Sequence, residues 1–233
     1  MGWLRMAEEA ATQLLFPHHC AGCGTDLLSR ETEICWHCLG SLPETRFASL
    51  AANPAEKIFW GRIPLEAAAA TFFYTHGSVL QTLMQSFKYH SNQLLGKQLG
   101  RLMGQSLLEG GRFQADALIP VPLHPLKERQ RGFNQAAVLC HGMAELLKIP
   151  VIEGVLIRKH ATETQTRKGR LGRWANTEGK FAVSQPAAIK GLHCLLVDDV
   201  ITTGATLESC GGTLLQVPDT RLSIAALCIA SQV

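Results

Sequence analysis

The chain contains 233 residues, of which 46% are hydrophobic and 18% are charged, and its formal net charge is +3. This composition is typical of a soluble globular protein with an ample core, and the net charge is too small to indicate nucleic-acid binding by itself. No apolar run is long enough to cross a bilayer, and two glutamates interrupt any secretory pattern near the N-terminus, so we expect a cytoplasmic protein without a membrane span. Its eight cysteines are then not expected to form disulfides.

Residues 3–16 carry apolar side chains at helical spacing, with acidic residues on the other face. An acidic polar face disfavours a helix that lies on a membrane surface, so we expect a helix that packs on its own protein. This helix would be the first element of a small N-terminal module.

Two C-x-x-C pairs follow: Cys20 with Cys23, and Cys35 with Cys38. Each pair makes a tight knuckle that points two thiolates at one metal ion, and two knuckles complete a tetrahedral site with four sulfur ligands. A redox role needs only one pair, so we predict a structural zinc ion with no open coordination position. Trp36 lies inside this module and is a candidate for stacking on nucleic-acid bases, although packing is the expected role. The remaining cysteines lie singly in apolar runs and are expected in the core: Cys140, Cys194, Cys210 and Cys228.

The next part of the chain alternates between apolar segments and breaks. Residues 39–64 contain three prolines and little periodicity, which predicts a linker over the surface. Residues 67–75 predict a strand, and residues 77–108 show two helical patterns. The polar break between these two helices holds Lys88 and His90, and it is either a solvated turn or a functional one.

A buried strand is predicted at residues 117–123 and leads directly to His124. The loop that follows carries three cations: Lys127, Arg129 and Arg131. It opens a helix at about Asn134. Cations beside a helix start at the end of a strand suit an anion, and the alternative is a solvated basic turn.

Residues 151–157 predict another strand, and residues 158–181 form a strongly basic segment with three glycines. Such a segment could close on a diphosphate or follow a nucleic-acid backbone. The residues in it that we select as lid candidates are Gln165, Arg167 and Arg173. Trp174 is a second candidate for base stacking, again with packing as the expected role.

The stretch around which the chain is organised is 193–207, reading HCLLVDDVITTGATL. A short apolar run predicts a buried parallel strand, and Asp198 and Asp199 follow it at once. The turn Thr202-Thr203-Gly204-Ala205-Thr206 then leads into a helix, whose first N–H groups and positive dipole end favour a phosphate. Two carboxylates beside a phosphate site make sense if a ribose donates its hydroxyls to them while its 5′-phosphate lies in the turn. A last buried strand is predicted at residues 222–230.

Strands that alternate with helices predict an α/β fold with a parallel sheet. The stretch 193–207 resembles the 5-phosphoribosyl-1-diphosphate (PRPP) signature of type I phosphoribosyltransferases. Nearly the whole chain resembles the ComF family, on the paired C-x-x-C, FKY near residue 88, IPVPLHPLKERQRGFNQ, a set of spaced residues between 164 and 181, and VDDVITTGAT. One departure is His90, where a basic Arg-like residue is expected after FKY.

The resemblance implies a type I phosphoribosyltransferase-like sheet flanked by helices, with a zinc-ribbon-like N-terminal module. We divide the chain into a helix and zinc module at 1–45, a linker with a possible strand at 46–76, and the phosphoribosyltransferase-like domain at 77–233. The resemblance also implies a cytosolic role in DNA uptake during natural transformation, with single-stranded DNA and a competence helicase as partners.

Two hypotheses follow for this chain. In the first it is an enzyme that holds Mg²⁺-bound PRPP, with an acceptor that the sequence does not identify. The acids Asp198 and Asp199 would bind the ribose and the turn at 202–206 its 5′-phosphate, while the basic loop from His124 to Arg131 and the lid would bind the diphosphate. In the second hypothesis the chain is a non-catalytic module that senses PRPP or a nucleotide and binds single-stranded DNA.

Overall fold

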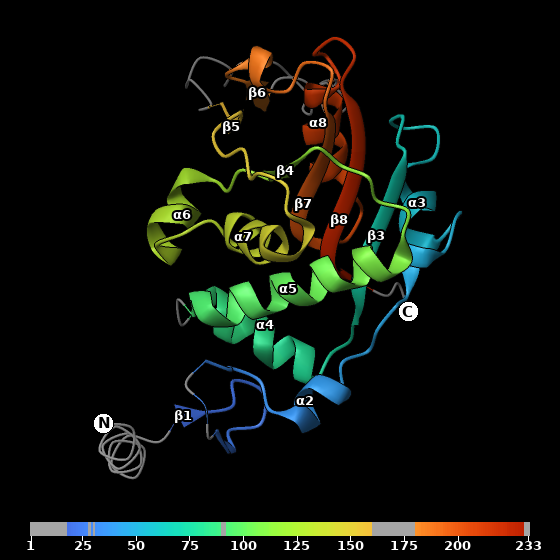
Figure 1. Cartoon of the computed structure of the whole chain (residues 1–233). Coiled ribbons are helices and arrows are strands. Elements are labelled where there is room, and N and C mark those ends of the chain that lie inside the picture. Colours follow the sequence, from blue (N-terminus) through green and yellow to red (C-terminus); the bar gives the residue numbers. More distant parts are fainter. Residues whose placement is uncertain (1–17, 28, 30, 90–91, 160–179, 231–233) are drawn as a thin grey trace, which may run out of the picture.

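A computed structural model of the chain describes residues 18–27, 29, 31–89, 92–159 and 180–230. Its centre is a sheet of four parallel strands in the order β3-β8-β7-β4 (Figure 1). These strands are β3 (Ala67–Tyr74), β8 (Arg221–Ala230), β7 (His193–Ile201) and β4 (Ala117–Pro120). Their residues are buried almost without interruption, as expected for a parallel sheet that is covered on both faces.

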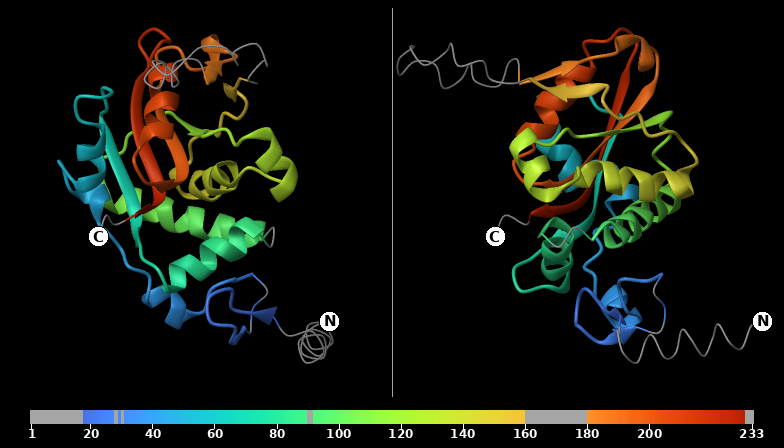
Figure 2. Two further views of the ribbon diagram at one scale, coloured as in Figure 1. Left: turned by 180° about the vertical axis from the view of Figure 1, so that it is seen from behind. Right: turned by 90° about the vertical axis from the view of Figure 1, so that its left-hand side faces the viewer.

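Helices cover both faces of this sheet (Figures 1 and 2). One face carries α4 (Val79–Tyr89), α5 (Gln93–Gly110) and α7 (Gln135–Leu147). The other carries α3 (Pro54–Phe59) and α8 (Ala205–Leu214). This confirms the predicted fold class of a parallel sheet flanked by helices.

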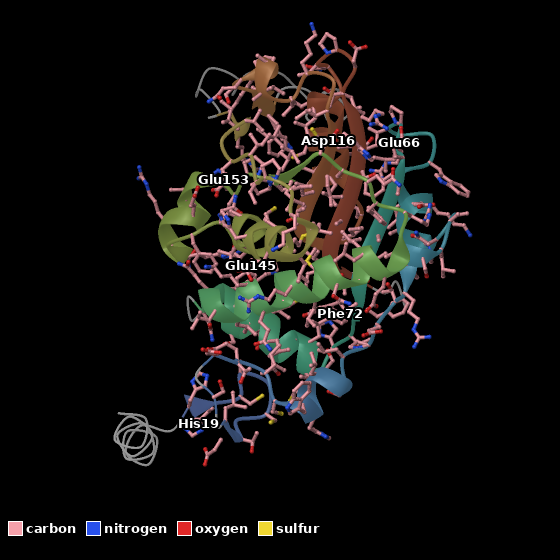
Figure 3. All side chains as sticks on the ribbon, viewed as in Figure 1. His19, Glu66, Phe72, Asp116, Glu145 and Glu153 are labelled. Carbon is pink, nitrogen blue, oxygen red and sulfur yellow. The ribbon has the colours of Figure 1, made fainter. Side chains whose placement is uncertain are left out.

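The helices α5 and α7 pack with their backbones unusually close. A Cβ atom on Gly142 would lie 2.2 Å from the carbonyl oxygen of Lys97, so only glycine fits there. An ion pair of 2.5 Å joins Arg101 of α5 to Glu145 of α7 (Figure 3). The two helices therefore form one layer, in which α7 packs on β4 and β7 and α5 packs on β8 and β3.

The connections that follow two neighbouring parallel strands pass to opposite faces of the sheet. After β4 it continues to α7 on one face, and after β7 it enters α8 on the other face (Figure 1). The two strands are hydrogen-bonded to each other in parallel, from Ala117 opposite Cys194 to Pro120 opposite Val197. Open α/β sheets bind ligands in the crevice at the carboxyl ends of strands where such a reversal occurs. The topology therefore selects the ends of β4 and β7 before any side chain is considered.

A small module below the sheet contains β1 (His18–His19), β2 (Asp26–Leu27) and α2 (Trp36–Gly40) (Figure 1). It is anchored on α5 through Glu33, which is 5% exposed. The Glu33 backbone N–H donates to Gln98 Oε1 at 2.8 Å, and Asn92 Nδ2 donates to Glu33 Oε2 at 2.6 Å.

The strands predicted at 67–75, 117–123 and 222–230 and the two helices predicted within 77–108 are confirmed. The four single cysteines are buried, as predicted: Cys140, Cys194, Cys210 and Cys228. Among the described residues, no helix is both long enough and apolar enough to cross a membrane.

The prediction of one strand at 151–157 is wrong. Val151 makes only an isolated bridge to Leu118, and the strand proper is β5 (Leu156–Arg158), which pairs antiparallel with β6 (Phe181–Val183) outside the main sheet. Gly154 has a φ of 72°, and this left-handed backbone interrupts the extended run.

The basic loop before Asn134 is instead the short helix α6 (Pro125–Arg131). His124 caps it, proline occupies its first turn, and Gly132 ends it with a φ of 80°. Proline at the start and glycine at the end are ordinary helix signals. The prediction of a loop rests on the charge of this segment alone and therefore misses the helix.

The predicted linker at 39–64 is more ordered than expected. It contains η1 (Phe47–Ser49) and α3, and the buried Asn53 ties it to the sheet by donating to the carbonyl of Ala68 at 2.9 Å. A second short helix, η3 (Pro186–Ala188), precedes β7. The division of the chain at residues 45 and 76 stays a prediction, although β3 lies in the same sheet as β8. The helix predicted at 3–16 and residues 160–179 of the basic segment lie outside the described residues.

Candidate functional site

A cavity of about 300 Å³ opens at the carboxyl ends of β4 and β7. Its walls come from segments far apart in the sequence: the ends of these two strands, the first turns of α7 and α8, Lys88 from α4 and Arg158 from β5. The cavity thus lies at the place that the strand connections select.

The turn between β7 and α8 forms one wall of this cavity. The strand ends at Ile201 and the helix begins at Ala205, so the turn predicted at 202–206 spans the helix start. The side chains of Thr202, Thr203 and Thr206 are exposed. Their hydroxyls and the first N–H groups of α8, which have no partner within the helix, are donors for an anion.

Gly204 is required in this turn for two reasons. Its φ is 74°, a left-handed conformation that other residues rarely adopt. A Cβ atom at this position would also lie 2.7 Å from Ile58 Cγ2 and 2.9 Å from Phe59 Cε1. The helix α3 therefore packs directly behind the anion-binding turn.

Arg62, just after α3, braces the same turn. Its guanidinium donates to the carbonyl of Thr203 at 2.8 Å and to that of Ile58 at 3.0 Å, and it forms an ion pair with Glu208 of α8. No sequence pattern indicates this role, because Arg62 lies in an irregular segment 141 residues before its partner Thr203.

The two acids Asp198 and Asp199 both line the cavity from the C-terminal part of strand β7. Successive strand residues point to opposite faces, and the register of β7 against β8 has no bulge at this point. Accordingly, besides burial, the charge of Asp198 raises the pKa of the Cys210 thiol of α8. Burial apart, the pKa of the Cys228 thiol of β8 is affected more by Asp199 and Lys88 than by Asp198. The acids therefore start from opposite faces of the strand, but their carboxyl groups still interact at its end, where, besides burial, Asp199 raises the pKa of Asp198 by its charge and by a side-chain hydrogen bond.

Lys88, in the polar break that the sequence left undecided, belongs to the cavity. Its Nζ lies 2.5 Å from Oδ2 of Asp199, and the two side chains are only 19% and 15% exposed. Burial and the charge of Asp199 raise the pKa of Asp198 to about 8, against the opposing effects of the Asp199 backbone N–H and Lys88. Near pH 7 the first acid is mostly protonated, and the charge of the second is balanced by the lysine.

The predicted diphosphate residues are placed differently from one another. His124 and Arg131 line the cavity, whereas Arg129 is exposed on α6 and is not among the described lining residues. His124 Nδ1 accepts a hydrogen bond from the Leu126 backbone N–H at 3.2 Å. Arg131 donates to Gln135 Oε1 at 2.8 Å. The structure does not describe the side chain of Lys127, and three lid candidates lie outside the described residues: Gln165, Arg167 and Arg173.

Arg158 adds a further cation that the sequence analysis did not select. It lines the cavity from β5, and its guanidinium lies 5.4 Å from the ring centroid of Phe181. Arg131 and Arg158 therefore add two cationic side chains to the lining of the cavity that holds the acid pair. The arrangement offers donors for anions and acceptors for hydroxyl groups within one small space.

The four cysteines of the N-terminal module converge on one point. The Sγ atoms of Cys20, Cys23, Cys35 and Cys38 all lie within 4.8 Å of one another, and those of Cys23 and Cys35 are 3.7 Å apart. Sulfur ligands in a tetrahedron about 2.3 Å from zinc are separated by about 3.8 Å. The cluster can therefore hold a metal ion such as zinc.

The environment lowers the pKa of one of these thiols, Cys20, whereas burial raises the pKa of Cys38. Burial raises the pKa of the Cys20 thiol, but N–H donors of Cys35, Cys23 and Gly22 outweigh it and lower the pKa to about 6. Trp36, beside the cluster, is 87% exposed, so the expectation that it packs is wrong. It lies on α2, where the ring points away from the module's small core.

Comparison with known proteins gives relatives that include DNA utilization and competence proteins. No family model matches the chain. It is 30% identical over 153 residues to "DNA utilization protein YhgH" of Salmonella typhi, which covers 64% of this chain and 66% of that protein. It is 31% identical over 134 residues to "Competence protein F" of Haemophilus influenzae (55% and 58%), and 29% identical over 143 residues to "Competence protein ComFC" of Bacillus subtilis (61% and 56%). Each match spans less than two thirds of the relative's own length.

Solved structures similar to this chain include two that act on phosphoribosyl groups by their titles. "Glutamine phosphoribosylpyrophosphate (PRPP) amidotransferase from B. subtilis" is 19% identical, with a TM-score of 0.44 over 61% of this chain and 30% of that one. "Adenine phosphoribosyltransferase" is 13% identical, with a TM-score of 0.40 over 60% and 73%. The function is therefore inferred from the geometry of the cavity.

Proposed function

The chain belongs to the ComF family, and on this premise we propose that its cavity binds PRPP, as part of a role in DNA uptake in the cytoplasm. The observation that carries the proposal is the meeting of an anion-binding turn and two carboxylates in one cavity at the ends of β4 and β7. A site for free phosphate would not gain from acids, because like charges repel. A ribose with a 5′-phosphate uses both halves.

Each part of the cavity has a role in holding this ligand. The turn 202–206 binds the 5′-phosphate through threonine hydroxyls and the N–H groups of α8. Asp198 and Asp199 accept hydrogen bonds from the ribose hydroxyls. His124, Arg131 and Arg158 attract the diphosphate, which brings Mg²⁺ with it as its counter-ion.

If the chain turns PRPP over, these residues also serve the chemistry. The bond between the anomeric carbon and the diphosphate oxygen breaks, the electron pair leaves with the diphosphate, and an acceptor forms the new bond to that carbon. The carboxylates counter the positive charge that develops on the sugar, and the basic side chains stabilise the departing diphosphate. The acceptor is unidentified, so binding without turnover is the alternative form of the proposal.

For the N-terminal module we propose a structural zinc ion held by its four cysteines. The exposed Trp36 favours a second, contact-making role for this module. Residues 18–45 carry four acidic residues against one arginine, so their charge does not suit a DNA backbone. Single-stranded DNA would then be bound by the basic segment 158–181, and Trp36 would serve a protein partner such as the competence helicase.

The experiment that tests the proposal is a titration of purified protein with PRPP and Mg²⁺, with diphosphate release followed in parallel, in the presence and absence of single-stranded DNA. Saturable PRPP binding supports the proposal, and diphosphate release decides in favour of the enzyme. Binding of DNA alone, with a steep salt dependence and no response to PRPP, would instead support the DNA-binding alternative.

A further inference from the structure

Lys88 is held against Asp199 by a packed framework rather than by chance. The residues of α4 that precede it are fully or almost fully buried: Leu80, Leu83, Met84 and Phe87. Cys228 lies 3.4 Å from Met84 through their sulfurs, and its Sγ approaches the carbonyl oxygen of Asp199 at 3.5 Å. The middle of α4, through Met84, and the C-terminal part of β7, through Asp199, therefore contact the same residue of β8.

Burial of the Lys88 ammonium group costs desolvation free energy, which suggests that its position serves a function. A four-carbon ammonium side chain usually reaches bulk water, yet this one is 19% exposed and its partner 15%. Taking two charges out of water costs more than it returns in many proteins. Here the pair lies in the wall of the cavity, beside the second acid.

Building on the proposed function, we propose that Lys88 is a positioning residue that holds the carboxylate of Asp199 in place in the empty cavity and yields it to a ribose hydroxyl when PRPP enters. The ammonium then faces the anionic oxygens of the ligand. The ion pair neutralises the acid that would otherwise repel the ligand's phosphates. The empty site is therefore matched to an anionic sugar and not to a neutral one.

The proposal has a consequence for pH. The groups that face the acid pair are Lys88 from α4, Arg158 from β5, His124 and Arg131 beside β4, Cys228 from β8 and Cys210 from α8. Of these, the lysine charge lowers the pKa of Asp198, which burial and Asp199 hold at about 8. Without the lysine this pKa rises, so ionisation of Asp198, and with it tight binding of the ribose, is delayed to higher pH.

The test compares three variants by calorimetric titration with PRPP between pH 6 and pH 9. Lys88→Met removes the charge, Lys88→Arg keeps it, and Lys190→Met removes an exposed lysine that is not among the described lining residues. We expect Lys88→Met to bind PRPP at least ~10-fold more weakly at pH 7, since charge-assisted contacts of this kind are worth about that much. The rise of PRPP affinity with pH should also have its midpoint at a higher pH in Lys88→Met. The other two variants should keep the wild-type midpoint.

A second measurement needs no ligand. Carboxyl ¹³C shifts of Asp198 in the ligand-free protein should titrate at higher pH in Lys88→Met than in Lys190→Met. If Lys88→Met matches the control in both affinity and midpoint, the inference is overturned while the PRPP site stands. If wild-type protein binds no PRPP at any pH, the proposed function is overturned, and the ligand-yielding role of Lys88 falls with it even if the ¹³C midpoint moves.

Discussion

The cysteine module and the strand-end cavity are built in opposite ways. The module gathers its four sulfurs from residues 20–38, so two short knuckles suffice to form it. The cavity gathers its groups from α4, α6, α7, β5 and the end of β7, and its phosphate turn is braced by Arg62 from outside. One region depends on local spacing and a metal ion, and the other on the position of whole elements in the sheet.

The largest expected effect lies in the module. Cys35→Ser should abolish metal binding and unfold this region, because a structural zinc site supplies on the order of 10 kcal/mol to so small a unit. Metal content and thermal unfolding are the measurements, and His37→Ala, an exposed change on the same helix, is the control that should keep the metal. Zinc-free wild-type protein with the same unfolding profile as the metal-loaded form would remove the metal from this account.

The next effect tests the framework behind the phosphate turn. Gly204→Ala should cost about 1–3 kcal/mol of unfolding free energy and weaken phosphate binding, because it combines a strained φ with contacts to Ile58 and Phe59. Gly212→Ala is the matched control, since a Cβ atom there meets nothing within 4 Å and alanine favours a helix. Equal stability of the two variants in chemical denaturation would show that α3 does not shape the turn.

A smaller effect should follow from loss of the brace. Arg62→Met leaves the fold in place but frees the carbonyl of Thr203, so phosphate affinity should fall by about 3- to 10-fold, as for one lost hydrogen bond to a charged group. Arg101→Met breaks a comparable exposed ion pair between α5 and α7, and should leave phosphate affinity unchanged. If both arginine variants bind phosphate as the wild type does, the turn is rigid without its brace, and the cavity is more local than we infer.

The sequence predicted most of what depends on local pattern. The C-x-x-C spacing predicted the sulfur cluster, and the run from Asp198 to Thr206 predicted two acids, a glycine turn and a helix after a strand, although β7 continues through both acids to Ile201. Apolar runs gave three strands of the sheet and the helices α4 and α5. These features have a signal within about ten residues, where periodicity and turn residues act.

The sequence did not show what depends on topology. Lys88 and Arg158 enter the cavity because α4 and β5 end beside it, and Arg62 reaches the turn across the packed α3. The FKY motif contains Lys88 and the basic segment 158–181 begins with Arg158, but neither pattern places its cation beside the acids. No short pattern indicates Arg62. Likewise, a left-handed Gly154 decided the limits of β5, and proline and glycine signals turned a basic loop into α6. Packing and backbone conformation, which a single sequence displays weakly, decided each of these points.

The central claim is that the acids bind a ribose while the turn binds its phosphate. The direct test is calorimetric titration of the Asp198→Asn/Asp199→Asn variant with PRPP and, separately, with inorganic phosphate. If loss of the Lys88 ion pair leaves the double variant poorly folded, Asp198→Asn alone serves at pH 9, above the Asp198 pKa of about 8, where this acid is ionised. We predict that PRPP affinity falls at least ~10-fold, because charge-assisted acceptors are lost, while phosphate binds as well as before or more tightly. Equal weakening of both ligands would mean that the acids only shape the turn, and would contradict the account.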